Sequence, residues 1–106
     1  MPTPLLKIAE VIRSKNSGPY ELTLDIIFRD WEIFRRVCAA RLITPERIAG
    51  LYRVPVADVL AIIEFEPAKA IKINLRRPIP SGSPGDTDVY GAQQHAPLLD
   101  LEFELP

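Results

Sequence analysis

The residue types best suited to chemistry in this sequence gather between Ser81 and His95. This stretch reads SGSPGDTDVYGAQQH and combines three glycines, two carboxylates, two amides, several hydroxyls, a tyrosine and the sole histidine of the chain. Glycine lets backbone amides approach an anion closely. Carboxylates can act as bases, and histidine is the side chain that ordinarily exchanges a proton near neutral pH. The pattern therefore favours Asp86, Asp88 and His95 as catalytic acid–base groups.

Other polar side chains of the same segment are candidates for holding a substrate. They are the hydroxyl and amide residues Ser83, Tyr90, Gln93 and Gln94. The segment lies in a long loop at 78–97, and a loop of this length inside a compact domain is usually functional. The alternative is structural: Asp, Ser and Thr cap turns, and His95 hydrogen-bonds the backbone. One histidine and two aspartates without further spaced ligands do not indicate a metal site.

A second candidate stretch runs from Arg13 to Glu21 and reads RSKNSGPYE. Two cations next to small polar donors can hold a carboxylate or phosphate, so Arg13, Lys15 and Asn16 are predicted to bind substrate. The alternative is that Arg13 and Lys15 neutralise the carboxyl end of a preceding helix. A turn is expected at residues 16–19, where Asn, Ser, Gly and Pro follow one another.

The elements that must position these residues follow from hydrophobic periodicity. A helix is predicted over Leu5 to Ser14 and another from the N-cap Asp30 to about Arg41. A third helix opens at Thr44-Pro45 and ends near Tyr52, with a further helical turn at Val56 to Val59. Apolar runs or alternation predict the strands, at Tyr20 to Phe28, Leu60 to Phe65, Ala70 to Leu75 and Leu98 to Leu105.

This order of elements predicts one α+β domain over residues 1–106. The expected architecture is a mixed or antiparallel sheet of about four strands with helices packed on one face. Pro67 lies in a tight connection that would join two of the strands in a hairpin. The stretch TPERIAGLYRVPVADV also resembles a helix-turn-helix, but its second helix would be short and apolar, without donors for base edges. A structural helix pair is the interpretation that fits.

Charge and composition exclude several function classes. Thirteen basic residues face fourteen acidic ones among 106, so no general field attracts nucleic acid or anionic lipid. No apolar run approaches the length that spans a membrane, and the start does not resemble a signal peptide, so a cytoplasmic location is expected. Cys38 is the single cysteine, which excludes an internal disulfide and predicts a buried, inert thiol.

An oligomer or hetero-complex is also expected. The last predicted strand alternates acidic and apolar residues and leaves backbone groups available for pairing. The chain also holds more large aromatic side chains than a thin core needs, among them Trp31, Phe34, Tyr52 and Tyr90. The segment from Ser81 to His95 is expected to be ordered and packed against the domain or a neighbouring chain.

Three stretches carry a resemblance to a known family: RSKNSGPYELTLDIIF, TPERIAGLYRVPVADV and PIPSGSPGDTDVYGAQQHAPLLDLEF. They resemble a bacterial family of unknown function that accompanies, or is fused to, acyclic-terpene-utilisation A-like (AtuA-like) proteins. The resemblance implies a functional pair in the catabolism of carboxylic acids or acyl-CoA compounds, with hydro-lyase or carbon–carbon lyase chemistry. It supplies no established catalytic residues and no cofactor.

Two hypotheses follow from this resemblance. The first is a small subunit of a two-component hydro-lyase that contributes loop residues to a shared site. The second is a non-catalytic interaction or stabilising protein for the same AtuA-like large subunit. An independent enzyme is disfavoured because a chain of 106 residues leaves little concave volume for a pocket of its own. A homo-oligomer is compatible with both hypotheses.

Overall fold

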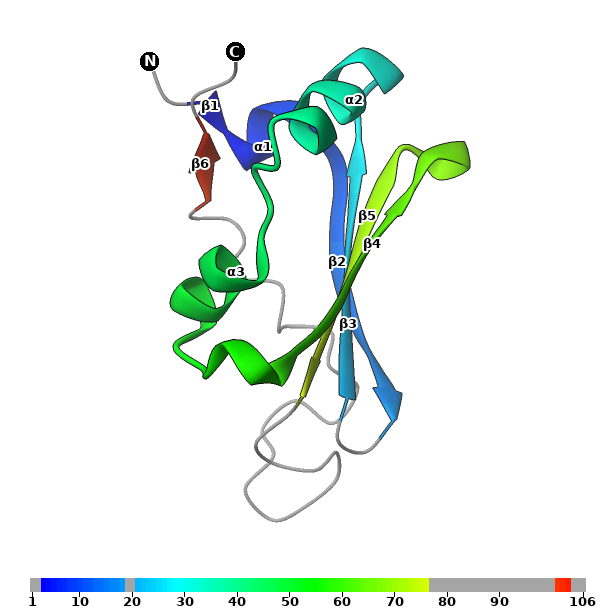
Figure 1. Ribbon diagram of the computed structural model, residues 1–106. Coiled ribbons are helices and arrows are strands. Elements are labelled where there is room, and N and C mark those ends of the chain that lie inside the picture. The colour runs from blue at the N-terminus through cyan, green and yellow to red at the C-terminus, as the bar shows by residue number, and fades with distance from the viewer. Residues whose placement is uncertain (1–2, 19–20, 77–100, 104–106) are drawn as a thin grey trace.

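The central feature of the computed structural model is a four-stranded antiparallel sheet in the order β2-β3-β5-β4 (Figure 1). The strands are Ala9–Gly18 (β2), Glu21–Phe28 (β3), Val59–Phe65 (β4) and Ala70–Arg76 (β5). The structure describes residues 3–18, 21–76 and 101–103. Hairpins join β2 to β3 and β4 to β5, and β3 pairs with β5, so β2 and β4 form the two edges.

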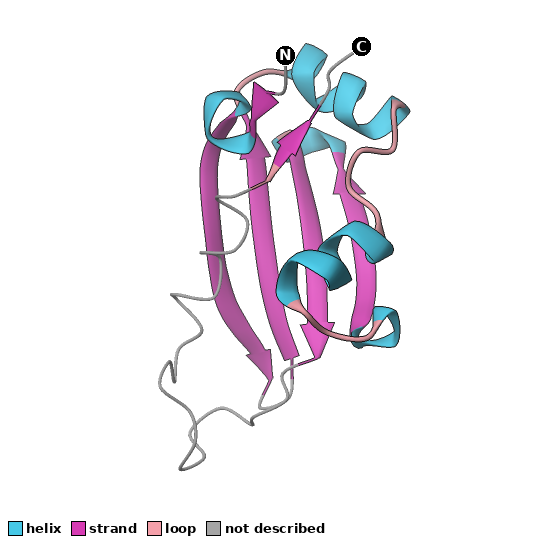
Figure 2. Cartoon of the chain, turned by 90° about the vertical axis from the view of Figure 1, so that its left-hand side faces the viewer, coloured by secondary structure: helices cyan, strands magenta, loops and turns pink. Residues whose placement is uncertain are grey.

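Three helices cover one face of this sheet, as Figure 2 shows with the helices in front of the strands. They are Leu5–Ile8 (α1), Trp31–Ala39 (α2) and Pro45–Tyr52 (α3). Short 3₁₀ turns precede and follow β4, and a small two-stranded sheet pairs the described ends of the chain; these elements are Val56–Asp58 (η1), Glu66–Ala68 (η2), Thr3–Pro4 (β1) and Glu102–Phe103 (β6). The predicted α+β class, with an antiparallel sheet and helices on one face, is confirmed.

The two longer helices begin at the predicted capping residues. The Asp30 side chain accepts a hydrogen bond from the backbone amide of Ile33 at 2.8 Å, and α2 starts directly after it. Thr44 accepts from the amide of Arg47 at 3.2 Å, and Pro45 occupies the first position of α3. A side-chain oxygen satisfies one of the amides that the first helical turn leaves unpaired. Both helix starts were therefore readable from local chemistry alone.

The predicted helix over Leu5 to Ser14 is wrong beyond its first turn. Helix α1 ends at Ile8, and the chain continues as β2, whose residues pair with β3 from Ala9 to Gly18. The stretch AEVIRSKNSG holds β-branched residues, serines, asparagine and glycine, all weaker helix formers than alanine or leucine. Its apolar spacing fits a helical stripe in the first half only. The ladder to β3 supplies the backbone hydrogen bonds that a helix would have made locally.

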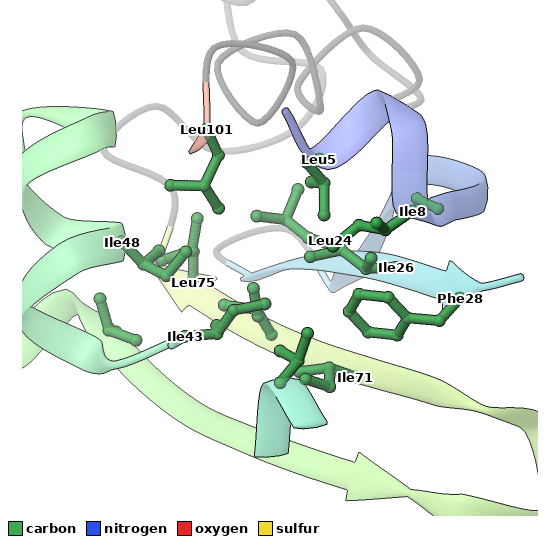
Figure 3. Close-up of a cluster of buried hydrophobic side chains, with 14 of the residues drawn as sticks. Leu5, Ile8, Leu24, Ile26, Phe28, Ile43, Ile48, Ile71, Leu75 and Leu101 are labelled. Carbon is green, nitrogen blue, oxygen red and sulfur yellow. The ribbon is translucent and has the colours of Figure 1, made fainter. Parts of the chain in front are cut away.

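The core lies between the helices and the covered face of the sheet. Figure 3 shows side chains from the helices and the sheet converging, with Leu5 from α1 and Leu101 near Leu24 and Ile26 of β3. Phe28 and Phe34 meet with their ring centroids 6.1 Å apart, which joins β3 to α2. Leu24, Ile26, Ile73 and Ile48 are fully buried. This contiguous cluster positions the sheet and the helices relative to one another.

Several local predictions also hold. Pro67 lies in η2, which connects β4 to β5 as the predicted hairpin. The second half of the helix-turn-helix pattern forms only the three-residue turn η1 before β4 begins. The predicted terminal strand from Leu98 to Leu105 is seen at β6, while residues 98–100 and 104–106 lie outside the described part.

No helix in the described ranges is both long and apolar enough to cross a membrane.

Candidate functional site

The sheet face opposite the helices carries a cluster of charged side chains in register. The strand pairing places Arg13 of β2 beside Asp25 of β3, and Asp25 beside Lys72 of β5. Side chains of directly paired residues lie on the same face of a sheet. The alternating residues Leu24 and Ile26 point into the core, so these three point away from it. We call this side of the sheet the open face, since no described helix covers it (Figures 1 and 2).

Asp25 is the centre of the cluster. Arg13 Nε donates to its Oδ2 at 3.1 Å, and Lys72 Nζ donates to its Oδ1 at 3.4 Å. The Asp25 side chain is only 5% exposed, whereas the side chains of Arg13 and Lys72 are 63% and 40% exposed. A buried carboxylate is tolerated when cations and hydrogen bonds compensate its lost hydration. Two cations share one carboxylate here, so the cluster has an excess positive charge that faces outward.

The positive charge extends along the open face towards the carboxyl end of β2. Lys15 pairs with Thr23, and Thr23 pairs with Asn74, whose Oδ1 accepts a hydrogen bond from the Thr23 hydroxyl at 2.9 Å. By the same alternation, Arg76 lies on this face opposite Glu21. Four cations and two carboxylates of the sheet therefore share this region, which we call the basic end: Arg13, Lys15, Lys72, Arg76, Glu21 and Asp25. Arg76 also pairs with Asp58 of η1 at 3.7 Å, so one net positive charge remains. The net charge of the basic end suits an anion such as a carboxylate or a phosphate.

The other half of the open face is apolar. Val11, Ile63 and Phe65 are 36%, 46% and 45% exposed, and they surround half-buried Ile27 and buried Ala70. We call these five residues the apolar end. Exposed apolar side chains are common singly, but a contiguous set on one sheet face is typical of an interaction surface. The open face thus pairs a positively charged half with an apolar half.

A shallow groove on the helix side lies between α2 and β4. It has two adjoining parts of about 390 and 780 Å³ that share Cys38, Ala39 and Glu64. Burial raises the pKa of the Cys38 thiol to about 12, with smaller contributions from its hydrogen bond to Glu64 and from the nearby carboxylates. The thiol therefore stays protonated at neutral pH and is a poor nucleophile. Cys38 is half-buried rather than buried as expected, and its inertness stays a prediction.

The predicted substrate-binding residues divide between described and undescribed parts of the chain. Arg13, Lys15 and Asn16 lie in β2, with Arg13 and Lys15 on the open face. The alternative role of neutralising a helix end is wrong, because α1 stops at Ile8. The remaining predicted site residues lie outside the described residues, and so does the packing expected of their segment; they are Ser83, Asp86, Asp88, Tyr90, Gln93, Gln94 and His95. Within the described ranges, no group of three His, Cys, Asp or Glu side chains could hold a metal ion.

Sequence reasoning missed two members of the charged cluster. Asp25 and Lys72 were not among the predicted site residues, and nothing in the sequence indicated that they were neighbours. The signal was present in the residues before Asn16: Val11, Arg13 and Lys15 alternate with Ile12 and Ser14 in the two-residue period of a strand. Recognising this segment as a strand would have predicted that Arg13 and Lys15 lie on the same sheet face as the charged residues of β3.

Comparison with known proteins assigns the chain to a family through a match over most of its length, not through the charged cluster alone. A search of curated proteins finds no match, and a search of solved structures finds none either. A family profile described as "Domain of unknown function (DUF4387)" matches residues 5–102, which includes every strand of the four-stranded sheet, all three helices and the segment from Ser81 to His95. The chain therefore belongs to the DUF4387 family.

Proposed function

We propose that this protein is the small subunit of a two-component catabolic enzyme whose large subunit is an AtuA-like protein. The pair would act as a hydro-lyase on carboxylic acids or acyl-CoA compounds. The observation that carries the proposal is the open face, where Arg13 and Lys72 flank the buried Asp25 next to exposed Ile63 and Phe65. A chain acting alone gains nothing from leaving such a face uncovered, whereas a subunit gains a docking surface.

The basic end supports the choice of an anionic substrate. Arg13 and Lys15 would hold a substrate carboxylate, with Lys72 as a third cation beside them. Asp25 would act through these cations rather than on the substrate, because its two oxygens already accept from Arg13 and Lys72. A guanidinium that a carboxylate holds in one orientation loses less conformational freedom on binding. Holding the carboxylate in place would then fix the neighbouring carbons for reaction.

Asp86, Asp88 and His95 would supply the proton transfers. A hydro-lyase must take a proton from one carbon and assist the departure of hydroxide from the next, so it needs a base and an acid. The sequence concentrates both residue types in one segment, and that segment follows β5, whose last residue Arg76 lies at the basic end. This sequence connection supports a site that the segment and the basic end build together.

The second hypothesis, a non-catalytic partner of the same large subunit, also has a specific observation in its favour. Two described groups that could otherwise take part in bond making are occupied or inert: Asp25 is paired with two cations, and the half-buried Cys38 thiol stays protonated. What the described residues offer is binding, not bond making. In this case the open face would hold the large subunit and nothing else.

Reconstitution with the AtuA-like large subunit tests the proposal. The complex would be assayed for hydration and dehydration of unsaturated and hydroxylated di- and tricarboxylates. Replacing Asp86→Asn, Asp88→Asn or His95→Gln should lower kcat by roughly 10²- to 10⁴-fold for the groups that transfer protons. Arg13→Met and Lys15→Met should raise KM first. Arg36→Met is the matched control, because Arg36 is an exposed cation on the helix side, paired with Glu32 at 3.0 Å.

The outcomes separate the hypotheses. Full activity in all three loop variants, with the complex intact, would leave only the non-catalytic hypothesis. Failure of the two proteins to form a complex at all would contradict both. Equal effects of Arg36→Met and Arg13→Met on KM would show that charge in general, rather than the basic end, attracts the substrate.

A further inference from the structure

Strand β4 exposes more large apolar side chains than any other described strand of the sheet. β4 is an edge strand, and Leu60, Ile63 and Phe65 on it are 40%, 46% and 45% exposed. Its neighbour β5 buries Ala70, Ile71, Ile73 and Leu75 almost completely. An edge strand offers unpaired backbone amides and carbonyls, and proteins usually protect such an edge with lysine, proline or a bulge.

The protection of β4 is confined to its ends. The ladder to β5 has its one irregularity between Val59 and Ala61, and Pro67 follows the strand in η2. Between them, the run from Ala61 to Phe65 pairs regularly with β5 and contains a single charged residue, Glu64. Among the described strands only β5 pairs with this run, so its other side is available to a further strand.

The run is complementary to itself. In an antiparallel pair related by a two-fold axis at Ile63, that residue meets its own copy, Phe65 lies opposite Ala61, and Ile62 lies opposite Glu64. The largest side chain thus meets the smallest on the open face, and the two Glu64 carboxylates avoid each other. Cross-strand pairs of this kind, apolar on one face and without like charges opposite one another, stabilise a sheet.

The helix side of β4 has room for the incoming side chains. The groove beside Cys38 lies along Ile62 and Glu64, which pair with the core-facing Ile73 and Ile71 and therefore point to the helix side. Arg41 lines the same groove, at the turn after α2. Arg41 shares this lining with the carboxylates of Glu46 and Glu64, so the groove offers space for the side chains of a second copy, and the pairing is argued from size and register rather than from charge.

We infer that β4 pairs antiparallel with β4 of a second copy, and that the protein is a two-fold symmetric dimer with one continuous eight-stranded sheet. Closed two-fold dimers are the commonest assembly of identical chains, and each contact in them is made twice. The open faces of the two copies become one surface, so the basic and apolar ends are duplicated. The inference goes beyond the proposed function and does not depend on the large subunit.

Light scattering of the full chain, alone and over a wide range of concentration, tests the inference. The unmodified protein should have the mass of a dimer. Ile63→Lys should be a monomer, because it places two cations opposite each other at the axis. Val11→Lys is the matched control: it adds the same charge to the same face on the other edge strand, β2, and should remain a dimer.

A cross-linking experiment keeps the test independent of folding in the lysine variant. With Cys38→Ser as background, Ile63→Cys should join two chains with a short thiol cross-linker, and Val11→Cys should not. A monomeric unmodified protein, or cross-linking that is equal at both positions, would overturn the inference. The inference would also be overturned if the unmodified protein were a monomer and Ile63→Lys abolished only its binding to the large subunit. In that case β4 would pair with a strand of that partner.

Discussion

The two faces of the sheet differ in what holds their side chains in place. On the covered face, Leu24, Ile26 and Ile73 are fully buried among apolar neighbours from the helices. On the open face, one residue away along the same strand, Asp25 is buried by the charged side chains of Arg13 and Lys72. On the covered face, apolar side chains exclude water from the core. On the open face, the carboxylate is buried by cations whose own side chains remain in contact with water. The two-residue period of a strand thus separates a packed apolar core from a charged surface.

The largest expected effect is a loss of core packing on the covered face. Phe28→Ala should lower the free energy of unfolding by about 3–5 kcal/mol, because Phe28 is fully buried and its ring meets Phe34. Phe65→Ala on the open face should lower it by less than about 1 kcal/mol when measured on the monomer. Urea denaturation followed by circular dichroism measures both. Equal losses would show that the open face is a second core.

The second effect concerns the buried carboxylate. Arg13→Met and Lys72→Met should each be mildly destabilising, since the remaining cation still pairs with Asp25. The double variant leaves the carboxylate buried without a cation and should lose more than the sum of the single variants, by about 0.5–3 kcal/mol. A double-mutant cycle in urea denaturation measures this coupling. Simple additivity would mean that water already solvates Asp25.

The third effect is smaller and concerns the helix that covers the sheet. Asp30→Ala removes the side-chain acceptor for the amide of Ile33 and should lower the free energy of unfolding by about 1 kcal/mol. Glu32→Ala, an exposed change in the first turn of the same helix, is the control and should have an effect within about 0.5 kcal/mol. If the two variants are alike, the packing of Phe34 and Val37 rather than the cap determines where α2 begins.

The smallest effect appears only at alkaline pH, at the margin of the covered face. Burial raises the pKa of Cys38 from 9.0 to about 12, so the native state holds this proton more tightly than the unfolded chain does. The resulting stabilisation is complete below pH 9 and is lost as the pH rises towards 12. Cys38→Ala should therefore show a shallower fall in unfolding free energy over this range. Tyr52, whose pKa burial also raises, is present in both proteins and does not affect the difference.

Thiol alkylation gives a second measure of the same proton. The rate of Cys38 alkylation should keep rising with pH beyond 9, because the reactive thiolate forms only as the pH approaches 12. Burial is the main cause of the raised pKa, and Glu64→Gln removes one of the smaller causes, the carboxylate charge, so it should modestly speed the reaction at a given pH. A rate that levels off near pH 9 would contradict the raised pKa.

Local chemistry made much of the fold predictable. The caps at Asp30 and Thr44, the proline at Pro45 and the alternation of Ala70 to Leu75 each act within a few residues, so reading them requires no knowledge of the rest of the chain. The α+β class followed from the order of these elements. Arg13 and Lys15, predicted to bind substrate, lie on the open face of the sheet, although the element assigned to them was wrong.

The conformation of residues 9–18 was decided by distant contacts. Leu5, Ile8 and Ile12 fit a helical stripe, and the same stretch also alternates as a strand, so its periodicity was ambiguous. Strand β3 is available as a partner along the whole segment, and pairing with it satisfies the backbone hydrogen bonds of residues 9–18. A short isolated helix over the same residues would be only marginally stable, so the strand forms instead.

By itself, the sequence determined where capped helices begin, which alternating segments are strands, and which residues carry charge. Only the tertiary structure decided that Arg13, Asp25 and Lys72 meet, since they are separated by 12 and 47 residues along the chain. It also decided that β4 lies at an edge and that one sheet face has no described helix over it. The physical reason is that capping and alternation act over a few residues, whereas strand order and register depend on how the whole chain buries its apolar surface.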